Sequence, residues 1–216
     1  MIKLNGIAVS NYYNMVKHTM LEKGIDFEEV VNPASQEPDY RKMSPMGKMP
    51  FIETDAGCLS ESTTIMDYLE ALKPSPALYP SDPFAKAKIQ EVMRILEQYI
   101  ELAGRRHYGH VFFKGPKSDA AVEEVRPVIE KSLVALQQLC SFDPYLCGSN
   151  FTYADIVAHS TFGYVNMATQ AIYGWDVVAE VAGLVDSLAA TSARESTKKI
   201  DADQGAALEA FMAAQG

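Results

Sequence analysis

Two short stretches of the chain carry residues that can hold a small anionic ligand. In the first, Met49 and Pro50 precede an apolar, β-prone run, so the proline removes a ladder donor and keeps Met49 extended. That placement favours a sheet edge whose backbone pairs with an extended peptide, above all if the Met49–Pro50 bond is cis. In the second, Glu61 and Ser62 open a helix whose free N–H groups and positive dipole end attract a carboxylate. Together the stretches predict a cradle for a small acidic peptide.

The same residues also have a purely structural interpretation. A hairpin followed by a capped helix uses Ser or Glu at the helix start for capping alone. Ser10 and Asn11 have the same ambiguity, because they stand where the first helix should be capped.

The elements that position these residues follow one another in a regular order. We expect a strand over residues 2–8, a helix over 12–23 that ends at Gly24, and a strand over 27–31. This βαβ order predicts a parallel pair with a right-handed crossover. The remaining elements complete the order β-α-β-α-β-β-α, which is the thioredoxin-like topology. They are a short irregular helix over 36–44, the Met49–Pro50 strand, a turn at 54–57, an antiparallel strand and the Glu61 helix.

A proline-rich segment then divides the chain. Residues 74–83 hold four prolines, which suits a stiff linker and not an element interior. Beyond it only helical patterns occur, and the expected helices cover residues 84–113, 120–140, a segment opened by Thr152, 176–190, 193–200 and a tail at 203–214. The fold class is therefore α/β plus all-α, with domains at 1–76 and 84–216 and a linker at 77–83.

The third of these helices has the pattern of a capping box. The Thr152 hydroxyl should cap the Asp155 N–H while the Asp155 carboxylate returns to the Thr152 N–H, with Phe151 packed on Ile156 as a hydrophobic staple.

Composition limits the possible functions. The 216 residues include 19 basic and 28 acidic side chains, and the net charge of −9 disfavours nucleic acid and anionic membranes. No secretory signal or membrane-spanning run is recognisable, so we expect a cytoplasmic protein. The cysteines Cys58, Cys140 and Cys147 match neither a disulfide framework nor metal-ligand spacing, which predicts free thiols and no metal.

These features resemble one known family. The order of a K-M-P strand, a hairpin and an E-S helix start is similar to the glutathione-binding half of glutathione S-transferases. The run G-S-N-F-T-Y-A-D-I at 148–156 is similar to the capped core helix of their second domain. The resemblance implies a detoxifying homodimer with glutathione as co-substrate, no metal, and neither nucleic acid nor membrane as partner.

The resemblance also implies roles for the residues of the cradle. Met49, before a cis Pro50, would pair with the cysteinyl backbone of glutathione. Glu61 and Ser62 would take its γ-glutamyl end, and Lys48 would hold its glycyl carboxylate. An exposed lysine is also commonly just solvated.

Glutathione chemistry needs a thiolate, and lowering a thiol pKa by about two units corresponds to roughly 2.7 kcal/mol. Serine-type relatives place their hydroxyl in a segment S-x-x-x-x-x-V, which Ser10 and Val16 match. The resemblance thus implies Ser10 as hydrogen-bond donor to the sulfur, with Asn11 and Tyr12 as alternates because they depart from the usual small and basic residues.

The electrophile pocket is expected to include Tyr12, Tyr13, Arg106 and His107, and the arginine could orient an anionic co-substrate. Cations at a helix C-terminus provide a simpler interpretation for the last two.

The function implied is a glutathione transferase that activates the thiol for attack on a small electrophile. Two alternatives remain: a glutathione-dependent isomerase or disulfide or peroxide reductase, and a non-catalytic interaction module of the same fold.

Overall fold

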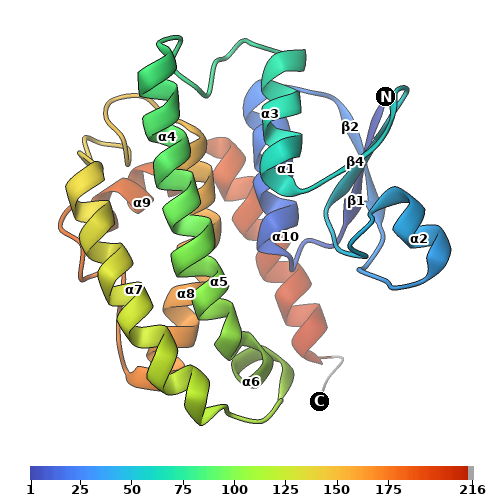
Figure 1. Ribbon diagram of the computed structural model, residues 1–216. Helices are drawn as coiled ribbons and strands as arrows, with labels where there is room; N and C mark the ends of the chain where they lie inside the picture. Colours follow the sequence, from blue (N-terminus) through green and yellow to red (C-terminus); the bar gives the residue numbers. More distant parts are fainter. Residues whose placement is uncertain (214–216) are drawn as a thin grey trace. The chain divides into compact units, whose positions relative to one another are not determined.

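The computed structural model describes residues 1–213, and the chain divides into two compact units (Figure 1). The first unit holds residues 1–77 together with the segment from Arg194 onward, and the second holds residues 78–193. The sequence-based division instead assigns the whole of 84–216 to the helical domain. The C-terminal segment differs because it packs on the first unit, as described below. Residues 214–216, which that division and the predicted tail include, lie outside the described residues.

The first unit is built on a four-stranded sheet of order β2-β1-β3-β4. β1 and β2 are parallel, whereas β3 is antiparallel to both β1 and β4, which confirms the predicted βαβ unit and hairpin. Asn5 of β1 pairs with Phe51 of β3, which in turn pairs with Ser60 of β4. The strands span Ile2–Gly6 (β1), Phe27–Val31 (β2), Phe51–Thr54 (β3) and Gly57–Ser60 (β4).

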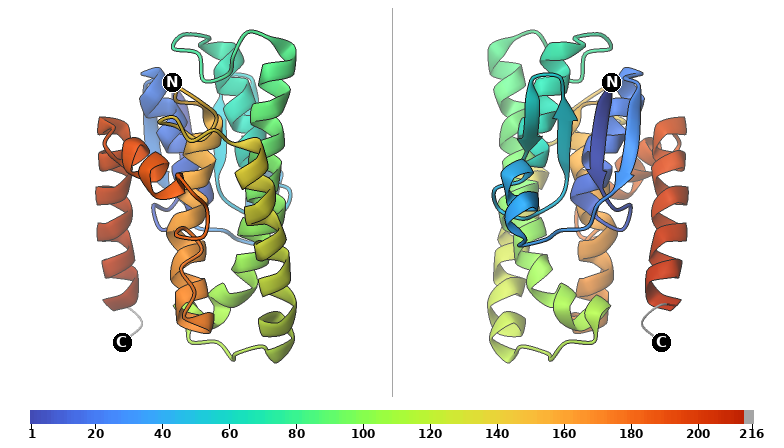
Figure 2. Two further views of the ribbon diagram at one scale, coloured as in Figure 1. Left: turned by 90° about the vertical axis from the view of Figure 1, so that its left-hand side faces the viewer. Right: turned by 90° about the vertical axis from the view of Figure 1, so that its right-hand side faces the viewer.

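Helices cover the sheet. α1 and α3 pack together against one face, behind the strands in the right-hand view of Figure 2, and α2 lies beside β4. α1 ends at Gly24 with φ 57°, the left-handed cap predicted for that glycine. The core between α1, α3 and the sheet consists of buried apolar side chains: Leu4, Tyr13, Val16, Met20, Ile52, Ile65 and Leu69. These helices span Asn11–Lys23 (α1), Pro38–Met43 (α2) and Ser62–Leu72 (α3).

The last helix, α10 (Glu195–Ala213), packs against α1 through polar groups. Arg194 binds the Glu22 carboxylate with two hydrogen bonds, Nε to Oε1 at 2.8 Å and Nη2 to Oε2 at 2.6 Å. Ser196 donates to the same carboxylate, and the buried His18 ring lies 3.1 Å from the Ser196 hydroxyl. Burial disfavours the charged form of Glu22, but hydrogen bonds from His18, Arg194 and Ser196 outweigh it and hold the pKa of the carboxyl well below its usual range.

A second polar contact joins the same two helices. The Lys17 ammonium is 2.7 Å from Glu29 on β2 and 2.7 Å from Asp203 on α10, and the Lys17 side chain is only 2% exposed. A buried cation needs such paired acceptors, so α10 completes the environment of α1.

Replacing Glu22 by Gln is expected to reduce the free energy of unfolding by about 2–3 kcal/mol at neutral pH, because a charged hydrogen-bond pair is lost. The folded-state pKa of Glu22 is depressed, so its contribution is complete above the ordinary glutamate pKa of about 4.3 and is lost as the pH falls below it. Calorimetry of both proteins at pH 7 and pH 3 should therefore show a difference that shrinks in acid.

The matched control is Asp39→Asn, which removes an exposed ion pair with Lys42. We expect no measurable change from this control at either pH. A Glu22→Gln difference that is the same at both pH values would contradict the role of the charged pair.

The second unit is all-helical, as predicted, but its helices depart from the expected bounds. The single helix expected over 84–113 is divided by a π-helical turn at 96–101 and a 3₁₀ turn at 105–107. The helix expected over 176–190 begins only at Leu184, because the Asp176 carboxylate accepts hydrogen bonds from the Val178 and Ala179 N–H groups and holds a turn. The helices span Pro83–Ile95 (α4), Leu102–Gly104 (α5), Tyr108–Phe113 (α6), Asp119–Leu139 (α7), Tyr153–Tyr173 (α8) and Leu184–Ser192 (α9).

α8 is the central helix of this unit and is buried on most of its surface. Its N-terminus has the predicted capping box: the Asp155 carboxylate accepts from the Thr152 N–H at 2.8 Å. The same carboxylate accepts from the Leu146 N–H at 2.8 Å and the Thr152 hydroxyl at 3.0 Å.

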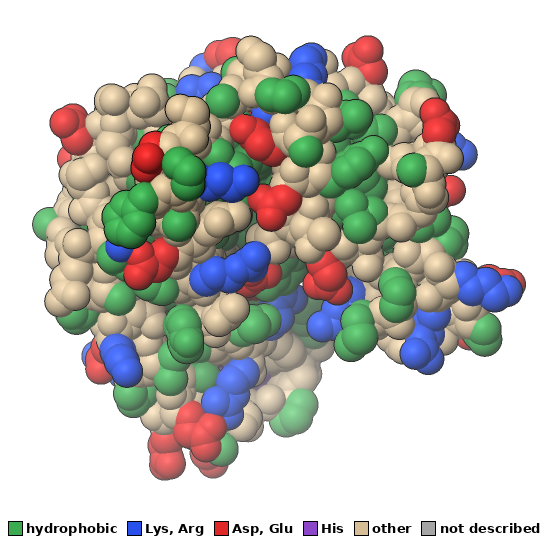
Figure 3. Space-filling model, turned by 45° about the horizontal axis from the view of Figure 1, so that its top comes forward, with side chains coloured by type: hydrophobic (Ala, Val, Ile, Leu, Met, Phe, Trp, Pro, Cys, Tyr) green, Lys and Arg blue, Asp and Glu red, His purple; other side chains and the backbone are tan. Residues whose placement is uncertain are grey.

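Charged side chains of both signs are interspersed on the face shown in Figure 3. Within residues 1–213, no helix combines the length and the apolar character needed to cross a membrane.

Candidate active site

The loop from β1 to α1 fixes Ser10 at the start of the helix. The Ser10 N–H donates to the Ile7 carbonyl at 3.0 Å, and its hydroxyl accepts from the Tyr13 N–H at 3.3 Å as the N-cap of α1. The capping role expected for Ser10 is therefore confirmed. Accepting one hydrogen bond leaves the hydroxyl proton available for another acceptor, so capping does not prevent donation to a sulfur.

Asn14, which was not among the predicted site residues, supports this loop. The side chain is buried, and its amide donates to the Ala8 carbonyl at 2.8 Å. A detectable signal existed, since Asn14 lies one helical turn after Ser10 and therefore on the same side of α1 as the loop that Ser10 ends.

The other candidates near Ser10 differ in exposure. Tyr12 is half-buried, whereas Asn11 and Tyr13 are buried. The Tyr13 hydroxyl donates to Glu29 at 2.6 Å, and its ring fills the space where a Cβ on Gly6 would stand, 2.5 Å away. Burial and hydrogen bonding to Glu29 raise the pKa of Tyr13 far above its usual value. Tyr13 is thus packed in the core of the first unit.

The segment before β3 is held rigidly. The Met49–Pro50 bond is cis, and the ladder of β3 begins only at Phe51. The Lys48 carbonyl accepts hydrogen bonds from the Ser44 hydroxyl at 2.6 Å and the Tyr40 hydroxyl at 3.2 Å, while the Lys48 side chain is exposed.

Gly47 allows this segment to turn. Its φ is 64°, and a Cβ there would lie 2.4 Å from the Ser35 carbonyl oxygen. Only glycine fits without moving the backbone that leads to Met49.

At the start of α3, the backbone of Glu61 has an unusual conformation and its side chain does not cap the helix. Glu61 has φ 70°, a conformation that costs a non-glycine residue about 1–3 kcal/mol and is typical of functional positions. The Glu61 side chain makes no capping hydrogen bond, so it does not occupy the N–H groups of the first turn. Ser62, the first residue of α3, is 6% exposed.

The strand register brings these three segments to the same end of the sheet. Asn5, Phe51 and Ser60 form one row across β1, β3 and β4. β1 leaves this row towards Ser10, β3 enters it from Met49–Pro50, and β4 leaves it towards Glu61. All the residues predicted to bind glutathione therefore belong to one end of one sheet, within the first unit.

The two candidates in the helical unit differ in exposure. Arg106 forms an ion pair with Glu124 of α7 at 2.8 Å. His107 is 2% exposed, and its Nε2 lies 2.8 Å from the Tyr173 hydroxyl. Burial, with the charge of Arg106 next in importance, lowers the pKa of His107, which favours the neutral ring.

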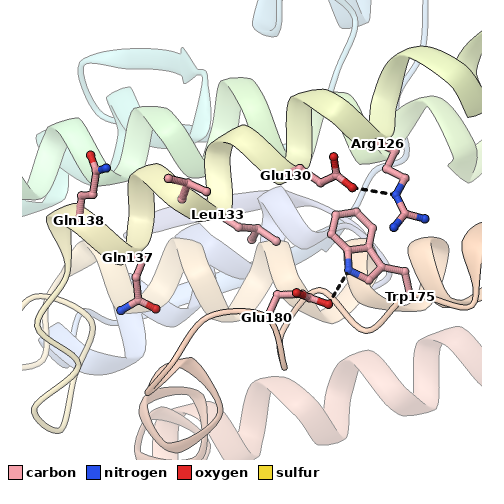
Figure 4. Close-up of a pocket in the computed structure, with 8 residues that line it drawn as sticks. Arg126, Glu130, Leu133, Gln137, Gln138, Trp175 and Glu180 are labelled. Atoms are coloured by element: carbon pink, nitrogen blue, oxygen red, sulfur yellow. Dashed lines mark hydrogen bonds and ion pairs between the residues drawn. The ribbon is translucent and has the colours of Figure 1, made fainter.

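A separate cavity of about 550 Å³ lies on the helical unit, between α7 and the segment after α8 (Figure 4). None of the predicted site residues lines it. Its polar groups already engage one another: Trp175 donates to Glu180 at 3.0 Å, and Arg126 binds Glu130 at 2.8 Å while stacking over the Trp175 ring. The cavity is lined by Arg126, Glu130, Leu133, Val134, Gln137, Gln138, Trp175 and Glu180.

Comparison with known proteins identifies the family. The sequence model described as the glutathione S-transferase N-terminal domain matches residues 4–77, and that of the C-terminal domain matches residues 119–189. A protein of Pseudomonas putida called glutathione S-transferase is 36% identical over 212 residues, which cover 98% of this chain and 96% of that protein. The chain therefore belongs to the glutathione S-transferase family of enzymes.

Two further similarities are limited, the first by low sequence identity and the second by the short stretch that it covers. The crystal structure of glutathione transferase F2 from Populus trichocarpa matches the fold with a TM-score of 0.81 at 21% identity, over 95% of this chain and 100% of that chain. A Drosophila melanogaster protein called probable maleylacetoacetate isomerase 1 is 41% identical over 58 residues, which cover 27% of this chain and 24% of that protein.

Proposed function

We propose that this enzyme binds glutathione at the end of the sheet formed by the Ser10 loop, Met49–Pro50 and Glu61–Ser62. Ser10 donates a hydrogen bond to the glutathione sulfur and so stabilises the thiolate. The thiolate then attacks a small electrophile, by addition or by displacement of a leaving group.

The observation that carries this proposal is the row Asn5–Phe51–Ser60, because it gathers three segments that are far apart in the sequence. The N-terminal family model spans residues 4–77 and so includes all three segments. The positive φ of Glu61 at the start of α3 favours a ligand-binding enzyme over a non-catalytic module of the same fold.

Each end of glutathione has a matching group. The backbone of Met49 is outside the β3 ladder and suits pairing with the cysteinyl unit. The open start of α3, with Ser62, suits the γ-glutamyl carboxylate, and the exposed Lys48 ammonium suits the glycyl carboxylate.

The electrophile is less well defined. The exposure of Tyr12 supports a place for it in the pocket, whereas the burial of Tyr13 and His107 favours structural roles for both, and Arg106 is engaged by Glu124. The short match to an isomerase keeps glutathione-dependent isomerisation as a second candidate. Assays with aryl halides, enals, organic peroxides, maleylacetoacetate-like acids and glutathionyl disulfides separate these reactions.

The proposal also includes a cytoplasmic homodimer with a role in detoxification. The three free cysteines support a reducing compartment, and the homodimer and detoxification follow from the family resemblance.

Replacing Ser62 by Ala is expected to weaken glutathione binding about tenfold or more, since a hydrogen bond to a charged group contributes about 1.5–3 kcal/mol. Calorimetric titration of the wild type and the variant with glutathione measures this loss. Thr64→Ala is the matched control, because Thr64 is exposed on the same helical turn and its hydroxyl has no proposed contact with the ligand. Absence of binding by the wild type would refute the proposed function, and an equal loss in both variants would refute the role of Ser62.

A further inference from the structure

The turn that follows α7 brings two cysteines together. Cys140 is the C-terminal cap of α7 and has an extended backbone. The Ser141 N–H donates to the Leu146 carbonyl at 3.0 Å, which reverses the chain and sets Cys147 opposite Cys140. The Cys140 and Cys147 side chains lie within interaction range of each other, and both residues are half-buried.

This turn is anchored to the central helix of its unit. Tyr145 and Gly148 exchange two backbone hydrogen bonds, at 3.0 and 3.2 Å, and so close the segment that carries Cys147. The neighbouring Leu146 N–H donates to the buried Asp155 carboxylate at the start of α8. The two sulfur atoms are therefore held near each other by a hydrogen-bonded framework.

The two thiols are not equivalent. The interaction with the Cys147 side chain, together with burial and the nearby Asp155 charge, raises the pKa of the Cys140 thiol far above its usual value. Cys140 thus keeps its proton. Because its thiolate is disfavoured, Cys147 is left as the sulfur that attacks first.

We propose that Cys140 and Cys147 are a redox-active dithiol, which small disulfides such as glutathione disulfide oxidise to an intramolecular disulfide. The Cys147 thiolate attacks one sulfur of the small disulfide, forms a mixed disulfide and releases one thiolate. Cys140 then loses its proton and attacks the Cys147 sulfur, which releases the second small thiol. Two cysteine thiols are oxidised and one external disulfide is reduced to two thiols.

The framework favours this outcome over a lasting mixed disulfide. The hydrogen bond from the Ser141 N–H to the Leu146 carbonyl keeps the two cysteines on facing sides of one turn, so Cys140 is a neighbour of any mixed disulfide formed on Cys147. Cys58, which is exposed on β4, provides an internal comparison, because it is the only cysteine of the first unit and has no second thiol to resolve a mixed disulfide.

The test treats the full chain with glutathione disulfide, alkylates remaining thiols and identifies each cysteine by mass spectrometry. In the wild type we expect a Cys140–Cys147 disulfide, which dithiothreitol reverses, and a glutathione adduct on Cys58 alone. In Cys140→Ser, Cys147 should accumulate as its glutathione adduct. In Cys147→Ser, Cys140 should react at least tenfold more slowly than Cys147 does in the other variant.

The wild-type result is independent of how well the variants fold. If Cys58 is modified while Cys140 and Cys147 both stay reduced, or if both carry glutathione, the proposal is overturned. Equal reaction rates in the two single variants, each checked for native helicity by circular dichroism, would overturn the order of attack.

Discussion

Replacing Ser10 by Ala raises the kinetic pKa of enzyme-bound glutathione by about one to two units and leaves the dissociation constant of glutathione nearly unchanged. The reason is that the hydroxyl stabilises only the ionised sulfur, and a charge-assisted hydrogen bond contributes about 1.5–3 kcal/mol. At neutral pH the thiolate fraction, and with it kcat/KM, falls about 10- to 100-fold. The measurement is the pH profile of kcat/KM with an electrophile that the wild type uses.

This variant also removes a helix cap, so it needs a control that separates stability from chemistry. Ser118 caps α7 as Ser10 caps α1, with its hydroxyl accepting from the Ala121 N–H at 3.2 Å. Both Ser10→Ala and Ser118→Ala should lose about 1 kcal/mol of stability. Only Ser10→Ala should move the pH profile.

An unchanged profile in Ser10→Ala would transfer the donor role to Asn11 or Tyr12. Tyr12→Phe distinguishes these two, because it removes the phenol hydroxyl and keeps the ring. A shift in Tyr12→Phe without one in Ser10→Ala would identify the half-buried tyrosine as the donor.

Replacing Asp155 by Ala is expected to destabilise the helical unit by about 3–5 kcal/mol, the largest loss of stability that we predict. The buried carboxylate accepts hydrogen bonds from the N–H groups of Leu146 and Thr152 and from the Thr152 hydroxyl. The substitution leaves three buried donors without an acceptor. Trp175, the only tryptophan, lies in this unit, so its fluorescence during urea unfolding reports on the unit itself.

Asp155→Asn separates the acceptor role from side-chain volume. The amide retains one oxygen, so it can satisfy some of the donors and should lose less stability than Ala. A loss below about 1 kcal/mol in Asp155→Ala, no greater than that of an ordinary cap, would show that the turn before α8 does not depend on this carboxylate.

Features with a local sequence signal were predicted well. The parallel β1–β2 pair and the β3–β4 hairpin follow from short apolar runs separated by a helix or a turn. The left-handed cap at Gly24 and the capping box at Thr152–Asp155 depend on neighbouring residues alone, and both were confirmed. The row Asn5–Phe51–Ser60, which brings Ser10, Pro50 and Glu61 to one end of the sheet, follows from the same topology.

Features that depend on distant partners were not predicted. Lys17, His18 and Lys23 look like the solvent-exposed side of α1, yet all three are buried because α10 and the segment after α3 supply their acceptors. The packing of the Tyr13 ring in the core was not predicted either, because it depends on the missing Cβ at Gly6. Neither α10 nor Gly6 is related to these residues of α1 by the three- or four-residue spacing of a helical pattern.

The contact between Lys17 and Asp203 joins residues that are 186 positions apart. During synthesis, the sheet and α1 leave the ribosome before the helical unit and α10. The first unit therefore cannot complete its fold until the sequence of the whole helical unit has been translated. Maturation of the proposed glutathione site is in this way coupled to translation of α10, and a product that stops before Arg194 leaves Lys17 without Asp203 and Glu22 without Arg194 and Ser196.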